Sequence, residues 1–506
     1  MRIQYALRMT GQLIMLYSLF LLIPFAYGVT TGEVYVSFAA AAAVGLCLGR
    51  LIFSAGIRCD TVSIRDGFFV VGMTWLASGL LGALPFYFGG ILPDIENALF
   101  ESVSGITATG ASVIGNVDAL PRPFILWRSL MHWAGGMGIV VLVLAFVKNP
   151  GAEGAYFFNA ESTVPRPGVV LPRIRSTASA LWKIYMLFTA SCFILLLFSG
   201  VPPFDALNMS LSTVSTGGFL PSSDGMFRYN GDVAVMIVLT LFMFLGGGNF
   251  TLYYSVREKG FRALTEDTEY RVYTALILVG AAAVSADLVT NGYAEAISVA
   301  DALFMYTSMQ TGTGFAISNY DAWPNAAKTI LFVSTFLGGC SGSTTGGLKI
   351  VRLIILFKST YIHMQKALHP RLVKALKLNG KVLYADRVRV VRQFFVLYMT
   401  IFVASAALIA LTGVPPGESL QCAAGILGNV GLAFGMLGPT ASFEVLHPFA
   451  KFVCMFDMIV GRLEIFTVLV LLHPDFGRGY FAEIHVKRAP ERRVWNGPGG
   501  TERRRI

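Results

Sequence analysis

Ten apolar stretches divide the chain, and each is long enough to form a helix that crosses a lipid bilayer. A membrane-spanning helix needs about 20 mostly apolar residues, and short segments rich in glycine, proline or charge separate the stretches here. The pattern therefore predicts an all-α membrane protein with about ten transmembrane helices. They are expected at residues 11–28, 35–55, 67–90, 125–147, 178–200, 232–255, 270–292, 325–347, 392–412 and 447–472.

The composition agrees with a membrane protein and excludes several other classes. Of the 506 residues, 55% are hydrophobic and 13% are charged, whereas a soluble globular protein has about 25% charged residues. The net charge of +10 lies in short basic blocks between apolar runs, so it predicts no nucleic-acid partner. The six cysteines have no paired spacing, which predicts neither a disulfide framework nor a zinc site. No pairing of a nucleophile with a base supports an enzyme.

The basic blocks predict the orientation of the chain in the membrane. They follow the second, fourth, sixth and eighth apolar stretches and recur in the C-terminal tail; residues 349–392 alone hold eleven Lys or Arg and one acid, Asp386. Loops rich in Lys and Arg remain in the cytoplasm. We therefore expect a multi-pass protein of a cytoplasmic membrane with both termini on the cytoplasmic side. The first two stretches are expected to remain as a helix pair, since no small-residue cleavage site follows the first.

Four shorter apolar segments on the opposite side share one spacing. They begin at Asn97, Asp205, Asp301 and Glu418, and in each a glycine follows 13 residues later, at Gly110, Gly218, Gly314 and Gly431. Half-length segments within a membrane are tolerated only where protein or water surrounds them. The pattern predicts four re-entrant pore helices in parallel repeats of span, pore helix and span, related by fourfold pseudo-symmetry. The acids on this side either concentrate cations at the mouth or cap helices, and the leading polar residues are expected to be helix N-caps.

The loops that follow these segments are suited to bind a dehydrated cation. Backbone carbonyls replace the hydration shell of an ion without a full charge that would trap it, and glycine gives the backbone access to positive φ. Close helix packing also uses glycine, but it does not account for four glycines in one register. The candidate filter residues are Ala108, Thr109, Gly110, Thr216, Gly217, Gly218, Gly312, Thr313, Gly314, Asn429, Val430 and Gly431.

Residues 338–347 interrupt the eighth stretch with five glycines. A phosphate-binding loop would end in Gly-Lys-Ser/Thr, which is absent here, so we expect an unwound segment that lines the cavity beneath the filter. Arg462 lies near the middle of the last stretch, where it either pairs with Glu464 or Asp457 or acts on the ion pathway. Lys349 either reaches the same region as Arg462 or marks the cytoplasmic end of its span, and the second interpretation is preferred. His132 is interpreted as a packing residue and Asn249 as an interhelical hydrogen-bonding residue.

Several motifs resemble the Trk/Ktr/HKT superfamily of potassium transporters, and most closely its bacterial TrkH-type subunits. They are TATGAS at 107–112, STGGF at 215–219, TGTGFA at 311–316, GNVG at 428–431, GGCSGSTTGGLK at 338–349 and GRLEIFT at 461–467. The resemblance covers nearly the whole chain. It implies a filter with one glycine per loop, and four glycines imply potassium over sodium. The chain departs from many TrkH-like members at Leu432, where they have proline after the fourth filter glycine.

The resemblance also implies a gate beneath the filter. The gating residues would be Arg462, whose charge would repel potassium and bond to the loop, together with Gly338, Gly339, Ser341, Gly342, Ser343, Thr344, Thr345, Gly346 and Gly347. Potassium at the filter is then the only metal expected, as the substrate, and no covalently bound cofactor is expected.

The implied partners are a second copy of the chain and a cytosolic nucleotide-binding ring of the TrkA type. The basic segment 349–392 would bind either that ring or anionic lipid. The alternative function is a potassium symporter with alternating access, coupled to protons or sodium; such carriers often have inverted repeats, whereas the repeats here are parallel. The expected division is a helix pair at 1–60 and four pore repeats at 61–176, 177–266, 267–390 and 391–506.

Overall fold

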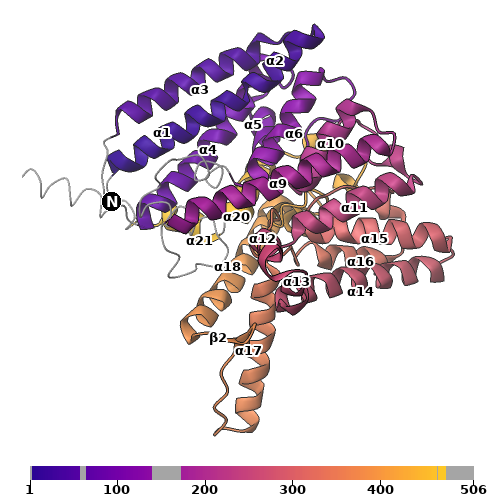
Figure 1. Cartoon of the computed structure of the whole chain (residues 1–506). Coiled ribbons are helices and arrows are strands. Elements are labelled where there is room, and N and C mark those ends of the chain that lie inside the picture. Colours follow the sequence, from indigo (N-terminus) through magenta and orange to yellow (C-terminus); the bar gives the residue numbers. More distant parts are fainter. Residues whose placement is uncertain (1–2, 57–63, 139–171, 464, 475–506) are drawn as a thin grey trace, which may run out of the picture.

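The computed structural model describes residues 3–56, 64–138, 172–463 and 465–474, and these are mainly helical (Figure 1). The N-terminal part contains α1 (Ile3–Phe20), α2 (Leu22–Thr31), α3 (Val36–Ser54), α4 (Ile64–Phe88), α5 (Ile95–Ile106) and α6 (Arg122–Gly136). The central part contains α9 (Pro172–Phe198), α10 (Pro203–Val214), α11 (Val233–Gly247), α12 (Phe250–Lys259), α13 (Arg262–Glu266), α14 (Thr268–Thr290), α15 (Glu295–Thr311) and α16 (Asn325–Ser334). The last part contains α17 (Ile350–Leu368), β1 (Lys377–Leu378), β2 (Lys381–Val382), α18 (Ala385–Ala410), α19 (Pro416–Leu427), α20 (Pro448–Leu463) and α21 (Ile465–Leu472).

Six helical segments among the described residues are long and apolar enough to cross a membrane, and a bent pair of helices adds a seventh candidate. The six are Gln4–Thr31, Val36–Ser54, Asp66–Phe88, Ala178–Phe198, Thr268–Thr290 and Ala385–Ala410. They correspond to six of the ten predicted spans. The predicted all-helical membrane architecture is therefore present, but three of the other four spans are not continuous helices, and the last span contains residue 464, which lies outside the described residues.

The span predicted at 232–255 is the bent pair. Helices α11 and α12 meet at an angle of 94°, because the run of glycines before Asn249 ends α11, and the Asn249 side chain then caps α12 by accepting from Thr251 N and Leu252 N. The expectation that Asn249 bonds between helices is thus wrong.

Two of the remaining three predicted spans are also interrupted. In 325–347, α16 ends at Ser334 and the next α-helix begins at Ile350. In the last span, α20 reaches Leu463 and α21 begins at Ile465, and residue 464 between them lies outside the described residues. In the span predicted at 125–147, α6 ends at Gly136 and the part from residue 139 onward lies outside the described residues.

Small residues bring the first helices close together. A Cβ atom on Gly11 of α1 would lie 2.6 Å from Gly49 O and 2.9 Å from the Cα atom of Phe53, both on α3. Without a hydrophobic driving force between helices in lipid, such close backbone approach supplies much of their association. The helix pair expected from the sequence is therefore packed as a unit, and it adjoins α4 (Figure 1).

The basic segment 349–392 forms a projection. Helix α17 and the start of α18 extend away from the rest of the molecule, with the strands β1 and β2 beside them (Figure 1). The hairpin turns at Asn379 and Gly380, which have φ of 48° and 74°, as an Asn-Gly type I′ turn requires. The basic tail expected on the same side, residues 478–506, lies outside the described residues.

Candidate functional site

Four helices, α5, α10, α15 and α19, end at the predicted filter loops. Their leading polar residues are not N-caps, which corrects the expectation from sequence: no side-chain cap bond is present, and α10 and α19 start at Pro203 and Pro416. Proline is favoured in the first turn because its fixed φ suits a helix and its missing N–H would have no partner there. Asp205 and Glu418 instead lie in the first turn, where the helix dipole favours a negative charge, and Asp301 lies inside α15.

The four helices end in the same backbone motif. The residue two before each repeat glycine has a left-handed conformation, with φ of 53° to 71°, at Ala108, Thr216, Gly312 and Asn429. The next N–H in each loop donates to the carbonyl five residues earlier, over distances of 2.8–3.0 Å, in the pairs Thr109–Ser104, Gly217–Ser212, Thr313–Ser308 and Val430–Gly425. This is the Schellman arrangement of helix ends. The fourfold repeat predicted from spacing is therefore also a repeat of backbone geometry.

Three of these left-handed positions carry a side chain, and that is unusual. A β-branched residue at positive φ, such as Thr216, is a genuine outlier, and Ala108 has little more freedom there. Among the described residues only one other non-glycine residue, Asn379 in the hairpin turn, has positive φ. Strained backbone persists where the surroundings over-determine it, often at functional sites.

The repeat glycines, Gly110, Gly218, Gly314 and Gly431, join the four loops into a closed ring. All four have positive φ, and a Cβ atom on each would collide with a backbone carbonyl oxygen of the next loop. A Cβ on Gly218, for example, would lie 2.7 Å from Thr313 O. In order round the ring, Gly110 faces the oxygen of Gly217, Gly218 that of Thr313, Gly314 that of Val430, and Gly431 that of Thr109. In each case the oxygen comes from the residue just before the next repeat glycine.

The helices that follow the loops pack against them through glycine as well. Added Cβ atoms on Gly135 of α6, Gly246 of α11 and Gly461 of α20 would meet the carbonyl oxygens of Ile106, Val214 and Leu427. Each of those oxygens lies four residues before a repeat glycine. The three helices thus approach the ends of α5, α10 and α19 at one shared register.

The glycine-rich segment lies directly beneath two of the loops. Its backbone is not helical between Thr335 and Lys349. The fully buried Thr344 donates its hydroxyl to Gly246 O at 3.1 Å and to Val214 O at 3.2 Å. A Cβ on Gly346 would collide with the side chain of Asn429, in the fourth loop. The segment therefore packs against the second and fourth loops from below.

Arg462 joins this segment to two of the glycine-bearing helices. Its guanidinium group donates to Thr344 O, and also to Gly135 O at 2.7 Å and to Gly136 O at the C-terminal end of α6. A helix C-terminus favours a cation. Of the two acids considered as partners from sequence, Asp457 accepts a hydrogen bond of 2.8 Å from Ser405, and Glu464 lies outside the described residues.

Lys349 takes the first of the two positions considered from the sequence, against the glycine-rich segment. It is buried, with 5% of its surface exposed, and its ammonium donates to Thr345 O and to the hydroxyls of Thr345 and Ser343, at 3.0 and 3.4 Å. It therefore holds the loop rather than only marking the end of a span.

Glu269 is a residue that sequence reasoning missed. Its Oε1 atom accepts from Ser341 N at 2.6 Å, from the Ser341 hydroxyl at 2.9 Å and from Val351 N at 3.2 Å. It thus ties the glycine-rich segment to the start of α17. The available signal was an acid at the basic, cytoplasmic end of a predicted span.

His132 is satisfied in the interior, as expected, and it also links two loops. Its Nδ1 atom bonds to Gly105 O at 2.7 Å, while its Nε2 accepts from Phe219 N at 3.1 Å. Because Nε2 accepts, Nδ1 carries the proton of a neutral imidazole.

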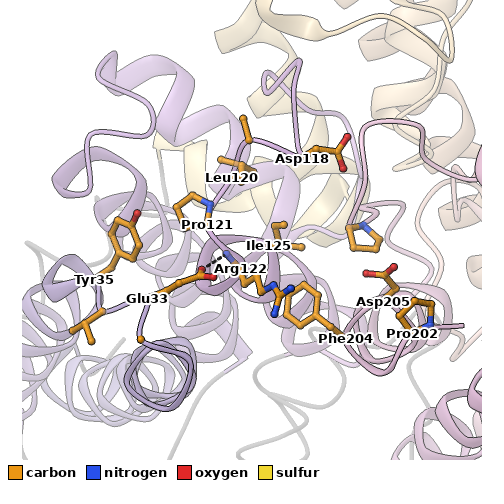
Figure 2. A pocket seen from close by; sticks show the side chains of 14 residues that line it. Glu33, Tyr35, Asp118, Leu120, Pro121, Arg122, Ile125, Pro202, Phe204 and Asp205 are labelled. Atoms are coloured by element: carbon orange, nitrogen blue, oxygen red, sulfur yellow. Dashed lines mark hydrogen bonds between the residues drawn. The ribbon is translucent and has the colours of Figure 1, made fainter.

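An open depression of about 800 Å³ lies beside the first two loops, and Figure 2 shows its lining. Asp118 and Asp205 line it, and Glu33 accepts a hydrogen bond of 2.8 Å from Arg122 N. Burial tends to raise the pKa of Asp118, but hydrogen bonds from Ser223 outweigh that effect and lower it. None of the predicted filter residues lines this depression, so it is separate from the ring.

Comparisons with known proteins agree with this architecture. The family model TrkH, described as a cation transport protein, matches residues 37–475. The chain is 34% identical to the Trk system potassium uptake protein TrkH of Salmonella typhimurium, over 86% of this chain and 91% of that protein. It is 33% identical to TrkH of Halomonas elongata, over 94% and 100%, and 34% identical to TrkG of Escherichia coli strain K12, over 93% and 98%.

A solved structure supports the same relationship. The crystal structure of the potassium transporter TrkH from Vibrio parahaemolyticus superposes with a TM-score of 0.85 at 30% identity, covering 94% of this chain and 100% of that chain. The resemblance found in the motifs is thereby confirmed, and with it the multi-pass membrane architecture. The chain belongs to the TrkH family of cation transport proteins.

Proposed function

We propose that this chain takes up potassium across a bacterial cytoplasmic membrane through a channel-like pore. The observation that carries the proposal is the closed ring in which every repeat glycine faces the carbonyl of the next loop. Such a ring brings backbone dipoles from all four loops around one axis, as a filter for a dehydrated cation requires. The relatives named as potassium uptake proteins support potassium as the ion.

The segment 338–347 and Arg462 form the gate in this proposal. The segment is packed beneath the loops, and the arginine places a fixed positive charge beside the proposed path of the cation. Like charges repel strongly where the effective dielectric constant is low, so the closed arrangement opposes conduction both sterically and electrostatically. Opening requires the loop to separate from Arg462. It also requires Thr344, which is part of the loop, to separate from the end of α11.

The same proposal includes the assembly and the placement of the chain. We place both termini in the cytoplasm, and four pore repeats follow an N-terminal helix pair. A second copy of the chain and a cytosolic nucleotide-binding ring of the TrkA type are the proposed partners. The basic projection around α17 is the docking surface for that ring in this scheme. Potassium is the only bound ion the function needs.

Cation flux into liposomes that contain the purified chain tests this function. Potassium, rubidium and sodium are compared, each with and without a proton gradient. Fast potassium and rubidium flux, little sodium flux and no need for a gradient are expected of a selective pore. A strict requirement for a gradient would refute the pore and indicate a symporter with alternating access instead.

A further inference from the structure

A buried ion pair lies behind the first two filter loops. Arg128 Nε and Glu101 Oε1 are 2.7 Å apart, and their side chains are 3% and 0% exposed. Glu101 belongs to the pore helix α5 and Arg128 to the following helix α6. Neither residue belongs to the predicted filter or to the predicted gate.

The pair contacts the chain just after the first repeat glycine. Ser112, two residues beyond Gly110, donates its hydroxyl to both carboxylate oxygens of Glu101 at 3.1 Å and accepts from Arg128 Nη2 at 3.1 Å. Val113 N donates to Glu101 Oε2 at 3.1 Å. The exit segment of the first loop is therefore fixed by four hydrogen bonds to two charged groups.

The same arginine also contacts the exit segment of the second loop. Its Nη1 donates to Leu220 O at 3.3 Å, and its guanidinium carbon lies 4.0 Å from the centre of the Phe219 ring. Phe219 directly follows the repeat glycine Gly218. One ion pair thus fixes the outer ends of two neighbouring loops relative to each other.

The repeat register shows that the other units lack this charge. The positions nine residues before the other repeat glycines hold Met209, Met305 and Cys422. The positions seven residues before Gly246 and Gly461, which match Arg128 relative to Gly135, hold Leu239 and Cys454. The sulfur atoms of Cys422 and Cys454 are 3.9 Å apart, so the fourth unit brings the same two positions together without charge.

The fold itself therefore does not require an ion pair at this place. Moving two charges out of water is costly, and an apolar pair of similar volume is often as stable or more stable. Unit two has apolar residues at the two matching positions, and unit four has a thiol pair there. The distinguishing property of the charged pair is its set of directional bonds to the two exit segments.

We propose that Glu101 and Arg128 are positioning residues that set the width of the filter between the first and second loops, and through it the preference for potassium over sodium. The proposal rests on the proposed function, since it concerns the selectivity of that pore. Neither side chain touches the ion. They hold the loop backbones at the separation that suits the larger cation, and their loss lets the carbonyls approach the smaller one.

The double variant Glu101→Met/Arg128→Leu tests this, because it copies the apolar pair of the second unit and leaves no unpaired charge. The matched control is Cys422→Met/Cys454→Leu, which makes the same pair in the fourth unit without removing a charge. A milder variant, Ser112→Ala, removes only the bridging hydroxyl. If the double variant does not fold, the ion selectivity of Ser112→Ala tests the positioning role in its place.

The readout is the ratio of rubidium to sodium influx into liposomes. We expect this ratio to fall roughly tenfold in the double variant, the size of effect that one hydrogen bond to a charged group produces, and to fall less in Ser112→Ala. Rubidium flux itself and the control variant keep the wild-type behaviour. A lower thermal stability with an unchanged ratio would show a merely structural pair and overturn the proposal. If the wild type does not discriminate between rubidium and sodium, the proposed function is refuted. If the wild type discriminates and both Ser112→Ala and the double variant discriminate equally well, only the positioning role is refuted.

Discussion

The repeat glycine Gly218 gives the sharpest test of the ring. An alanine there would place its Cβ atom 2.7 Å from Thr313 O and 3.2 Å from the Cα atom of Gly110, whereas ordinary contact begins at 3.4 Å. Both neighbours are backbone atoms that cannot rotate away. The carbonyl oxygen of the third loop therefore has to retreat by a large part of an ångström, which changes the oxygen cage that Gly218→Ala presents to the ion.

The backbone penalty of the substitution can be separated from the collision. Gly218 has φ of 97°, and Gly231 in the same unit has φ of 85° with nothing within 4 Å of an added Cβ. A side chain in the left-handed region costs about 1–2 kcal/mol, so Gly231→Ala is a matched control with a similar loss of stability. Only Gly218→Ala moves a carbonyl of the ring.

Flux of rubidium and sodium into liposomes, measured beside thermal unfolding, distinguishes the two effects. We expect both variants to unfold at lower temperature than the wild type. Gly218→Ala should lower the rubidium-to-sodium ratio by an order of magnitude, about 1.4 kcal/mol, and Gly231→Ala should leave it unchanged. A folded Gly218→Ala protein with wild-type selectivity would show that the carbonyl ring is not the filter.

Three further substitutions test the gate and the outer loops. Arg462→Met removes the donor to Thr344 O and to the end of α6 and should raise potassium flux without changing ion preference; flux at or below the wild-type level in a folded variant would contradict the gate. Glu269→Gln replaces the charged acceptor of Ser341 N–H, weakens that anchor by about 1–2 kcal/mol and should also raise flux, and unchanged flux would confine Glu269 to a role in folding. Burial, aided by the nearby Glu418, raises the pKa of Asp321 above its ordinary 3.8. The folded protein therefore binds this proton more tightly than the unfolded chain does, and its stability falls as the pH rises through the raised pKa. Asp321→Asn should flatten this part of the pH dependence of thermal unfolding, and an unaltered slope would refute the assignment.

Much of the architecture was predictable because a bilayer restricts the choices. Long apolar runs at 35–55, 270–292 and 392–412 predicted helices that are present as α3, α14 and α18, since every backbone polar group in lipid has to bond within its own segment. The 13-residue register also predicted the matching loops. Continuous apolarity misled at 232–255, because hydropathy does not register the sharp bend between Gly247 and Phe250.

The candidate site was predictable at its glycines and less so at its charged supports. The repeat glycines all have positive φ, a conformation that glycine adopts at little steric cost, so their spacing is visible in the sequence. Lys349 and Glu269 hold the glycine-rich segment through contacts with Thr345 and Ser341. Nothing in the local pattern distinguishes such residues from a charge at the end of a span.

By itself, the sequence determined the membrane class, the parallel repeat and the positions that only glycine can occupy, because each depends on local hydropathy or local backbone geometry. The tertiary structure decided which carbonyl each glycine faces, that Arg462 meets Thr344 and the end of α6, and that Glu101 and Arg128 pair behind two loops. These contacts join residues that are far apart in the chain or in different repeats. Their partners are chosen by the packing of helices around a common axis, and hydropathy and spacing carry no record of that choice.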